Sequence, residues 1–256
     1  MSEFVHLHVH STHSLLAAIC RIPDLARRAA DLGMGALALT DLGTLSGAVD
    51  FREECRRRGV RPLIGCEFWV TDGDHCARAK NERRHRLVLL AKNRTGYEHL
   101  VEMVSESHLN GFHFRPRIDR DLIAECRDGL VCLSGGVEGE IPRMLSEGRA
   151  EKAEAAAKWH RDVFGEDFFL EVAAHPPLAH PGDGEQRRWF ERQTKANEGI
   201  FELGRKLGIP VVATNDVFMV EREDWGAQEV LQAIGIGKKW SDANRIRCTG
   251  SEYHSG

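Results

Sequence analysis

The chain has 256 residues, of which 42% are hydrophobic and 29% charged, and its formal net charge is −4 at pH 7. These values are ordinary for a globular protein with one large, well-buried domain or two small ones. The slightly acidic balance argues against a chain that coats nucleic acid by itself. No apolar run approaches the roughly 20 residues that span a bilayer, and the N-terminus lacks the regions of a secretory signal.

Cysteine usage bears on the cellular compartment. The chain has seven cysteines at irregular spacing, and no two of them form a CxxC pair. An odd, irregular set predicts reduced thiols and a cytoplasmic location rather than a disulfide framework. The missing CxxC pairs also argue against a structural zinc ribbon.

Short β-rich runs alternate with segments of helical periodicity along the chain. The predicted strands are 4–8, 36–40, 63–70, 87–91, 130–133, 168–172 and 211–214. The predicted helices are 23–32, 46–58, 95–109, 119–126, 138–146, 151–164, 186–207 and 224–234. This alternation predicts a parallel sheet covered by helices.

The positions of the polar residues favour a closed barrel over an open nucleotide-binding sheet. No glycine-rich phosphate-binding loop follows the first predicted strand. Polar side chains instead follow the ends of several strands, where a barrel carries its functional groups. They are His8, His10, Asp41, Glu67, Ser134 and Asp216. We therefore predict an α/β fold, a distorted seven-stranded (β/α) barrel, formed as one domain over residues 1–256.

The chain opens with FVHLHVHS, in which His8 and His10 alternate with apolar residues. Alternate residues of a strand share one face, so these two imidazoles are expected to project together. Neutral imidazole is a ligand for Zn, Mn or Fe. The pair therefore predicts half of a metal site, and the rest of the chain has to supply the remaining ligands.

Several longer motifs resemble a known family. The runs FVHLHVHSTHSLL, ALTDLGTLSGAVDF (38–51) and PLIGCEFWV (62–70) look like successive motifs of the PHP (polymerase and histidinol phosphatase) domain. The runs RLVLLAKNRTGYEHL (86–100), RPRIDRDLI (115–123), LVCLSGGVEGE (130–140) and VVATNDVF (211–218) narrow the resemblance. Together they resemble the N-terminal domain of the alpha subunit of bacterial DNA polymerase III. The resemblance implies a PHP-type barrel whose last ~20 residues begin the connection to a polymerase region.

The resemblance also implies a trinuclear metal site at the barrel mouth. Four of its ligand positions are intact in this chain: His8, His10, Glu67 and Asp216. Five others carry a different residue type: Ala17 in place of Asp, Leu42 in place of His, Arg86 in place of His, Gly136 in place of Cys, and Phe218 in place of His. A catalytic divalent ion needs about three protein ligands. The remaining set is compatible with one residual Zn, Mn or Mg ion, held by the two histidines and either carboxylate, but not with a cluster of three.

Three hypotheses of function follow. The first is a non-catalytic domain of a DNA-directed DNA polymerase, which stabilises the polymerase and offers a docking surface for the proofreading exonuclease subunit. It expects no cofactor and only indirect contact with DNA. The second is a residual metal-dependent phosphoesterase or 3′-5′ exonuclease that uses the four intact residues. The third, an unrelated amidohydrolase-type barrel, requires further histidines and a lysine at strand ends.

Four other sequence features are not expected to supply metal ligands. His13 could replace a lost ligand, but it falls on an aromatic position of the family. Asp41 is expected to cap a turn or to orient a histidine rather than to bind metal. His175 and His180 are expected to be solvated in a loop rich in proline. The Asp-Gly-Asp run at 72–74 lacks the apolar flanks of a polymerase carboxylate pair.

Overall fold

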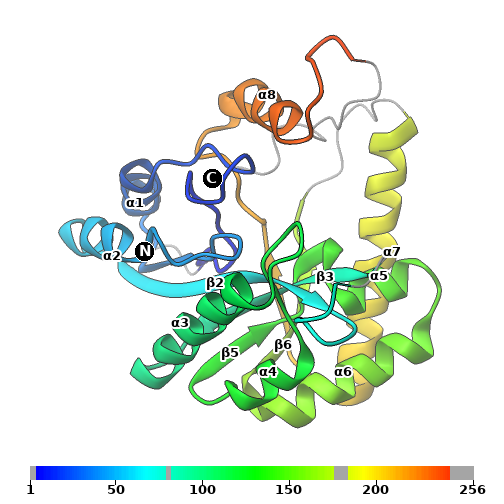
Figure 1. The fold of residues 1–256 in the computed structure, drawn as a ribbon. Coiled ribbons are helices and arrows are strands. Elements are labelled where there is room, and N and C mark those ends of the chain that lie inside the picture. Colours follow the sequence, from blue (N-terminus) through cyan, green and yellow to red (C-terminus); the bar gives the residue numbers. More distant parts are fainter. Residues whose placement is uncertain (1–3, 79–81, 176–183, 243–256) are drawn as a thin grey trace.

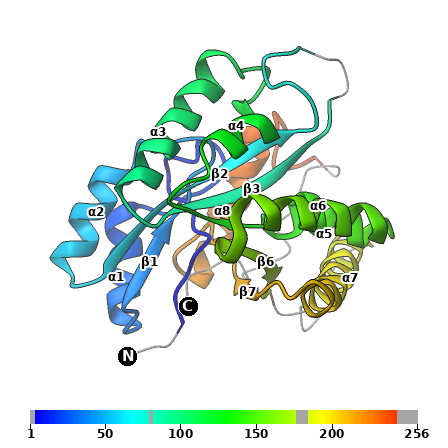
Figure 2. The ribbon, with the colours of Figure 1, turned by 90° about the horizontal axis from the view of Figure 1, so that it is seen from below.

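The computed structural model describes residues 4–78, 82–175 and 184–242, and its centre is a curled sheet (Figures 1 and 2). The strands follow the order β1-β2-β3-β5-β6-β7, with the short β4 beside β2. Their bounds are β1 (Ala36–Leu39), β2 (Arg61–Thr71), β3 (Arg84–Ala91), β4 (Arg117–Ile118), β5 (Leu130–Leu133), β6 (Phe168–Ala173) and β7 (Val211–Thr214). The fold is the α/β, distorted barrel that the sequence predicts.

The N-terminal segment joins the two edges of this sheet. On one side, the backbone N–H of Ala38 donates to the carbonyl of His6 at 2.9 Å. On the other side, His10 donates to the carbonyl of Val217 at 2.8 Å, and Val217 donates back to His8 at 3.0 Å. Segment 6–10 therefore lies between β1 and the residues after β7, and it closes the barrel.

The prediction of a regular strand over 4–8 is wrong, because the hydrogen bonds of this segment do not form a ladder. The structure gives it an isolated bridge between Val9 and Val217. The N–H of Val9 donates to the side-chain Oγ1 of Thr40 at 2.9 Å instead of to a backbone carbonyl. A side-chain acceptor in this position interrupts the backbone pattern that defines a strand.

The expectation of an all-parallel sheet is also wrong at one strand. β3 runs antiparallel to both β2 and β5, whereas β1–β2, β5–β6 and β6–β7 are parallel. Parallel neighbours need a crossover connection, but the described residues between β2 and β3 (72–78 and 82–83) form no helix. A chain that returns without a crossover can only pair antiparallel. β4, at two residues, is too short to show a periodicity in the sequence.

All eight predicted helices are confirmed, each within a few residues of its expected ends. They are α1 (Ile22–Asp31), α2 (Ala48–Arg57), α3 (Arg94–Leu109), α4 (Arg120–Glu125), α5 (Glu140–Ser146), α6 (Ala150–Phe164), α7 (Gly184–Leu207) and α8 (Trp225–Gly235). The side chains of Asn93 and Asp119 cap α3 and α4 by accepting from backbone N–H groups. Within the described ranges, none of these helices has the length and apolarity needed to cross a membrane.

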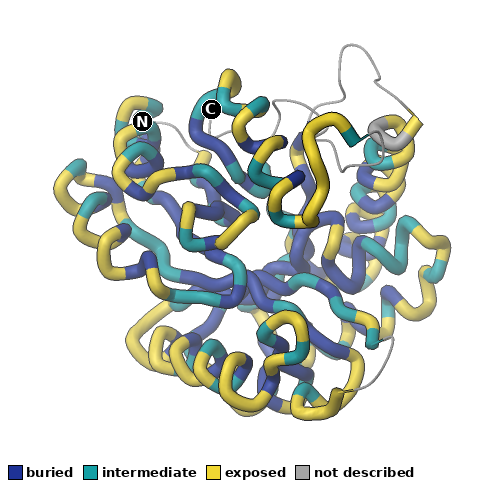
Figure 3. Tube along the Cα trace, turned by 45° about the horizontal axis from the view of Figure 1, so that its top comes forward, coloured by how far each residue is buried: buried dark blue, intermediate teal, exposed yellow. Residues whose placement is uncertain are grey.

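Alternate side chains of each strand point to the two faces of the sheet, so one set packs in an outer core and the other lines an inner face. Buried segments converge at the centre of the fold (Figure 3). On β3, Leu87 and Leu89 belong to the large core formed with the outer helices. Val88 and Leu90 belong to a small cluster with Ala38 and Leu133, which lies on the opposite face of the sheet. Because side chains alternate between faces, Arg86 shares this inner face with Val88 and Leu90.

Glu140, the first residue of α5, lies in a buried group of cationic and titratable side chains. Its carboxylate accepts from Arg120 at 2.8 and 2.9 Å. One of its oxygens lies 3.7 Å from the Nε2 atoms of both His85 and His160. Burial alone would raise the pKa of Glu140, but His160, His85 and Arg120 together lower it to about 2.

The low pKa of Glu140 predicts a pH dependence of stability. A shift from 4.5 to about 2 corresponds to a stabilisation on the order of 3 kcal/mol at neutral pH. Because the folded pKa lies below the unfolded one, this contribution is complete above about pH 4.5 and is lost as the pH falls toward 2. Urea unfolding of wild type and Glu140→Gln should therefore differ by this amount near pH 7 and converge only as the pH reaches about 2. A difference that stays constant with pH would contradict the assignment.

Candidate metal centre

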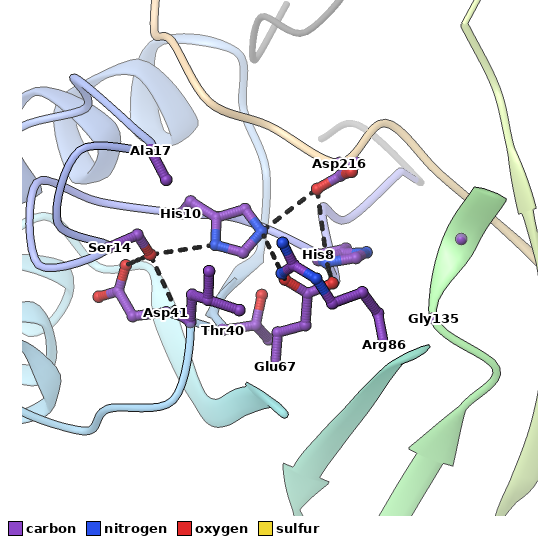
Figure 4. A network of polar contacts seen from close by, with 12 residues as sticks. His8, His10, Ser14, Ala17, Thr40, Asp41, Glu67, Arg86, Gly135 and Asp216 are labelled. Carbon is purple, nitrogen blue, oxygen red and sulfur yellow. Dashed lines mark hydrogen bonds and ion pairs between the residues drawn. The ribbon is translucent and has the colours of Figure 1, made fainter. Parts of the chain in front are cut away.

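The four residues predicted as ligands come from three parts of the chain and meet at one end of the barrel (Figure 4). His8 and His10 lie in the N-terminal segment, Glu67 in β2, and Asp216 just after β7. The Oδ1 atom of Asp216 is 3.2 Å from Nε2 of His10 and 3.4 Å from Nε2 of His8. Glu67 Oε1 is 3.4 Å from Nε2 of His8. The structure thus brings all four together.

A buried carboxylate that sequence analysis missed orients His8. Glu171, on the inner face of β6, lies 2.8 Å from the Nδ1 atom of His8. Its Oε2 accepts from the N–H groups of Gly135 and Gly136, each at 2.9 Å, and its Oε1 accepts from Thr214 Oγ1 at 2.5 Å. An ionised carboxylate only accepts, so Nδ1 of His8 donates and Nε2 faces Glu67 and Asp216. The space among His8, His10, Glu67 and Asp216 is called the pocket below.

Gly135 lets this contact form, because it has a φ of +86°. A Cβ atom on it would lie 2.2 Å from the carbonyl oxygen of Arg86. Glycine is the residue that tolerates both the left-handed backbone and this close approach. The turn directs two successive N–H groups at Glu171, as other anion-binding turns do.

Asp41 orients His10 through a serine, as expected for a residue outside the ligand set. Asp41 Oδ1 accepts from Ser14 Oγ at 2.7 Å. Ser14 Oγ lies 3.1 Å from Nδ1 of His10, and its proton is already committed to Asp41. Nδ1 of His10 is therefore the donor, and its Nε2 faces the pocket. Both imidazoles present the same nitrogen to the same space.

Arg86 forms an ion pair with Glu67 inside this group. The guanidinium carbon of Arg86 also lies 3.7 Å from the centroid of the Trp69 ring, which is a cation–π contact. Burial alone would raise the pKa of Glu67, but Arg86 and then His8 lower it. A full positive charge thus already neutralises one of the two carboxylates.

The second carboxylate is held ionised by the histidines. Burial alone would raise the pKa of Asp216, but His8 and His10 hold it well below its usual range. Burial opposes protonation of His8, and Asp216 and Glu171 outweigh it, so the pKa of His8 is raised. Asp216 has a φ of +49°, a strained value for a residue with a side chain. Such strain is concentrated at functional sites.

The structure also shows what occupies three of the five replaced positions. The ring of Phe218 stacks on His10 with a centroid separation of 4.5 Å and an interplanar angle of 12°. Leu42 forms an isolated backbone bridge to Glu67. The backbone N–H of Ala17 donates to the carbonyl of Ser14 at 2.9 Å, and the side chain of Ser14 contacts His10. These three side chains are apolar and offer no ligand atom.

The donor set fits one divalent ion. The ligand atoms of His8, His10 and Asp216 all lie within 4.8 Å of one another. Their inward atoms (the two Nε2 atoms and Oδ1) are buried and make no hydrogen bond within the described part of the chain. Two imidazoles and a carboxylate suit a Zn or Mn ion, which would displace any proton on the two Nε2 atoms. Such an ion would supply Lewis-acid activation of water or of a phosphoryl oxygen.

Three other histidines are placed as follows. Nδ1 of His13 lies 3.0 Å from Ser46 Oγ, so its partner is outside the pocket. His85, next to Arg86 on β3, faces Glu140 on the other side of the sheet. The expectation that His175 is solvated is wrong, because it is buried and its Nδ1 lies 3.2 Å from Gln193 Oε1 on α7. His180 lies outside the described residues.

The fold and the site define a distorted barrel with a histidine–carboxylate centre at its mouth. A sequence model of the PHP domain matches residues 6–175. The chain therefore belongs to the PHP domain family, and an unrelated amidohydrolase-type barrel is set aside. The chain is also similar to part of much longer curated proteins.

Those proteins are DNA polymerase III alpha subunits. The one from Borreliella burgdorferi is 38% identical over 256 residues, which is 99% of this chain and 21% of that protein. The one from Campylobacter jejuni is 33% identical over 264 residues, again 99% of this chain and 21% of that protein. The chain thus spans about a fifth of the length of these relatives. Among solved structures, one described as a metal-dependent phosphoesterase from Bifidobacterium adolescentis is 13% identical, with a TM-score of 0.40 and coverage of 83% of this chain and 86% of that one.

Proposed function

We propose that this chain is the PHP domain of a bacterial replicative DNA polymerase III alpha subunit and that it is structural rather than catalytic. The similarity to alpha subunits along 99% of the chain supports the assignment to that polymerase. The domain would extend over residues 1–256, with the last ~20 residues leading to the polymerase region. Residues 243–256 of that connection lie outside the described ranges. In the cytoplasmic replication machinery, the domain would stabilise the polymerase.

The ion pair between Arg86 and Glu67 carries the proposal that the metal site is decayed. Hydrolysis of a phosphodiester by a metal cluster needs bridging carboxylates and about three ligands for each ion. Here one carboxylate is neutralised by an arginine, and Ala17, Leu42 and Phe218 offer no donor atoms. What remains can hold a single ion at most, which cannot clamp both the attacking and the leaving oxygen.

The proposed role as a docking surface for the exonuclease subunit does not rest on the ion pair between Arg86 and Glu67. It follows from the resemblance to alpha subunits with incomplete ligand sets, in which the barrel would be kept for its shape and its contacts. A proofreading exonuclease subunit is the partner that such a role implies, with DNA contacted only indirectly. Co-purification of this exonuclease with the full-length polymerase alpha subunit tests the partner. A full-length subunit that polymerises DNA but retains no exonuclease would contradict the docking role.

One observation favours a second candidate function, a residual phosphoesterase or 3′-5′ exonuclease with one metal ion. The inward atoms of His8, His10 and Asp216 converge in the pocket. A single ion there would activate one water molecule for attack on phosphorus. Arg86, beside the pocket, could then neutralise a phosphate oxygen.

The substitution His8→Ala separates the two functions. The structural proposal expects wild type and variant to contain the same amount of metal and to hydrolyse no single-stranded oligonucleotide. The free energy of unfolding should fall by about 1–3 kcal/mol, because Glu171 loses a buried partner. His99→Ala, a change at a half-exposed histidine on α3 that contacts the carbonyl of Asp128, is the control for general effects. Loss of one equivalent of metal together with hydrolysis in His8→Ala alone would establish the enzyme instead.

A further inference from the structure

A second group of potential metal ligands lies outside the barrel mouth, in the segment that follows β2. Asp74, His75 and Cys76 place their ligand atoms within 4.8 Å of one another. Glu106, near the end of α3, brings a carboxylate oxygen to 3.4 Å from Nε2 of His75. The Sγ atom of Cys76 is 3.6 Å from the same nitrogen. One imidazole nitrogen therefore faces both a thiol and a carboxylate.

We propose that His75, Cys76 and Glu106 form a binding site for a Zn²⁺ ion. Tetrahedral zinc with bonds of about 2.3 Å to sulfur and about 2.0 Å to nitrogen and oxygen separates a nitrogen and a sulfur ligand by about 3.5 Å. It separates a nitrogen and an oxygen ligand by about 3.3 Å. The separations of 3.6 Å and 3.4 Å in this chain match both values.

The orientation of the His75 ring supports metal binding. Its Nδ1 atom lies 2.5 Å from Asp119 Oδ2, and the same oxygen accepts from the backbone N–H of His75 at 2.9 Å. The carboxylate fixes Nδ1 as the donor, so Nε2 is the ring nitrogen that faces Glu106 and Cys76. A carboxylate behind the imidazole is the usual arrangement at zinc-binding histidines.

A buried arginine holds the backbone of this segment. Arg117, on β4, is 1% exposed and donates to the carbonyl oxygens of His75 at 2.6 Å and Ala77 at 2.8 Å. Asn110 donates to Glu106 Oε1 at 2.7 Å and fixes the carboxylate from α3. The ligand atoms are thus positioned by the fold, so little ordering is left for the ion to impose.

The charge and chemistry of the group select zinc among the common divalent ions. The group combines one imidazole, one thiol and the carboxylates of Asp74 and Glu106. A cation bound there would displace the thiol proton and gain a thiolate ligand. Thiolate and imidazole favour zinc over magnesium or calcium. Asp74 or a water molecule would complete a four-coordinate site, which ties the segment after β2 to α3.

Metal content and cobalt absorption test the site on the purified full chain. After dialysis against micromolar Zn²⁺, wild type should retain one more zinc ion per chain than Cys76→Ser or Glu106→Gln. Co²⁺ in place of zinc should give a thiolate charge-transfer band that Cys76→Ser lacks. Asp119→Asn keeps a capping side chain for α4 and should weaken zinc binding by roughly 10- to 100-fold.

Two control variants make the result specific. Cys248→Ser removes a thiol elsewhere in the sequence and should leave both readouts unchanged. His8→Ala alters the barrel mouth, where the proposed ligands include no sulfur, and should leave the cobalt band unchanged. Cys76 is exposed, so its substitution is not expected to disturb folding. Equal zinc retention by wild type and Cys76→Ser, or a cobalt band that survives in Cys76→Ser, would overturn the proposal.

Discussion

The five-fold variant Ala17→Asp, Leu42→His, Arg86→His, Gly136→Cys and Phe218→His should bind at least two divalent ions at the barrel mouth, where we expect wild type to bind at most one. It restores every ligand type that the family resemblance assigns to these positions. With about three ligands for each ion available again, metal-activated hydrolysis of phosphodiesters should appear. Elemental analysis and hydrolysis of a single-stranded oligonucleotide measure the two effects.

The structure explains why these positions should act together. Arg86→His removes the guanidinium that neutralises Glu67, so this carboxylate becomes free to bind metal. Phe218 stacks on His10, so a histidine at position 218 would lie next to His10 and could supply a ligand atom to the same site. Replacing Arg86 alone should therefore raise affinity for a first ion without creating a cluster.

Of the five substitutions, Gly136→Cys is the one that strains the backbone. Its φ is +55°, but a Cβ atom there would have Glu171 Oε1 as its nearest neighbour at 3.8 Å. The space is sufficient, whereas the backbone conformation costs a residue with a side chain roughly 1–2 kcal/mol. A four-fold variant that keeps this glycine is the matched comparison. Adding Asp216→Asn to the five-fold variant is the negative control, since it removes a carboxylate at the centre of the site.

One result would refute the positional assignments. If the five-fold variant folds, as judged by its circular dichroism and unfolding transition, and yet binds no more metal than wild type, the replaced residues are not at the old ligand positions. The structural function would then need another explanation than loss of ligands. Hydrolysis that appears in the five-fold variant and disappears with Asp216→Asn would support both the positional assignments and the loss of ligands as the reason for the structural function.

The periodicity of the sequence is sufficient to predict the helices, but it does not predict the direction or regularity of every strand. Amphipathic segments with clear caps, such as 94–109 behind Asn93, are encoded locally and can be read from neighbouring residues. The direction of β3 depends on how the chain returns from β2, which the alternating pattern of a strand does not report. Segment 4–8 has the composition of a strand, but directly after it the N–H of Val9 donates to the side chain of Thr40 instead of to a neighbouring backbone carbonyl.

In the candidate site, too, residues within one short motif could be predicted from the sequence, whereas contacts between distant residues could not. His8 and His10 could be found because their spacing is visible within one short motif. Glu171 could not, because its partner is 163 residues away in the sequence. A signal was nevertheless present: Glu171 is the one charged residue in the run FFLEVA, and a charge in an apolar strand needs a buried partner. His175 was misjudged because the partner that buries it lies on α7.

Glu171→Ala should destabilise the fold by about 3–5 kcal/mol, among the largest effects expected of any single substitution in this chain. The side chain is fully buried and accepts from two glycine N–H groups and from Thr214. Without it, these donors and Nδ1 of His8 lose their acceptor in a site that water does not reach easily. Urea unfolding measures the loss, and Glu125→Ala, at an exposed position of α4, is the control that should change little.

Glu171→Gln separates the stabilising effect of this carboxylate from its effect on His8. An amide can still accept from the glycine N–H groups, so stability should fall less than in the alanine variant. Its NH₂ group cannot accept from Nδ1 of His8, so the imidazole should place its proton on Nε2, toward the pocket. In the five-fold variant, Glu171→Gln should therefore weaken metal binding by roughly 10- to 100-fold. Unchanged affinity would mean that Glu171 supports the turn at Gly135 and leaves the ligand nitrogen of His8 to be set by other contacts.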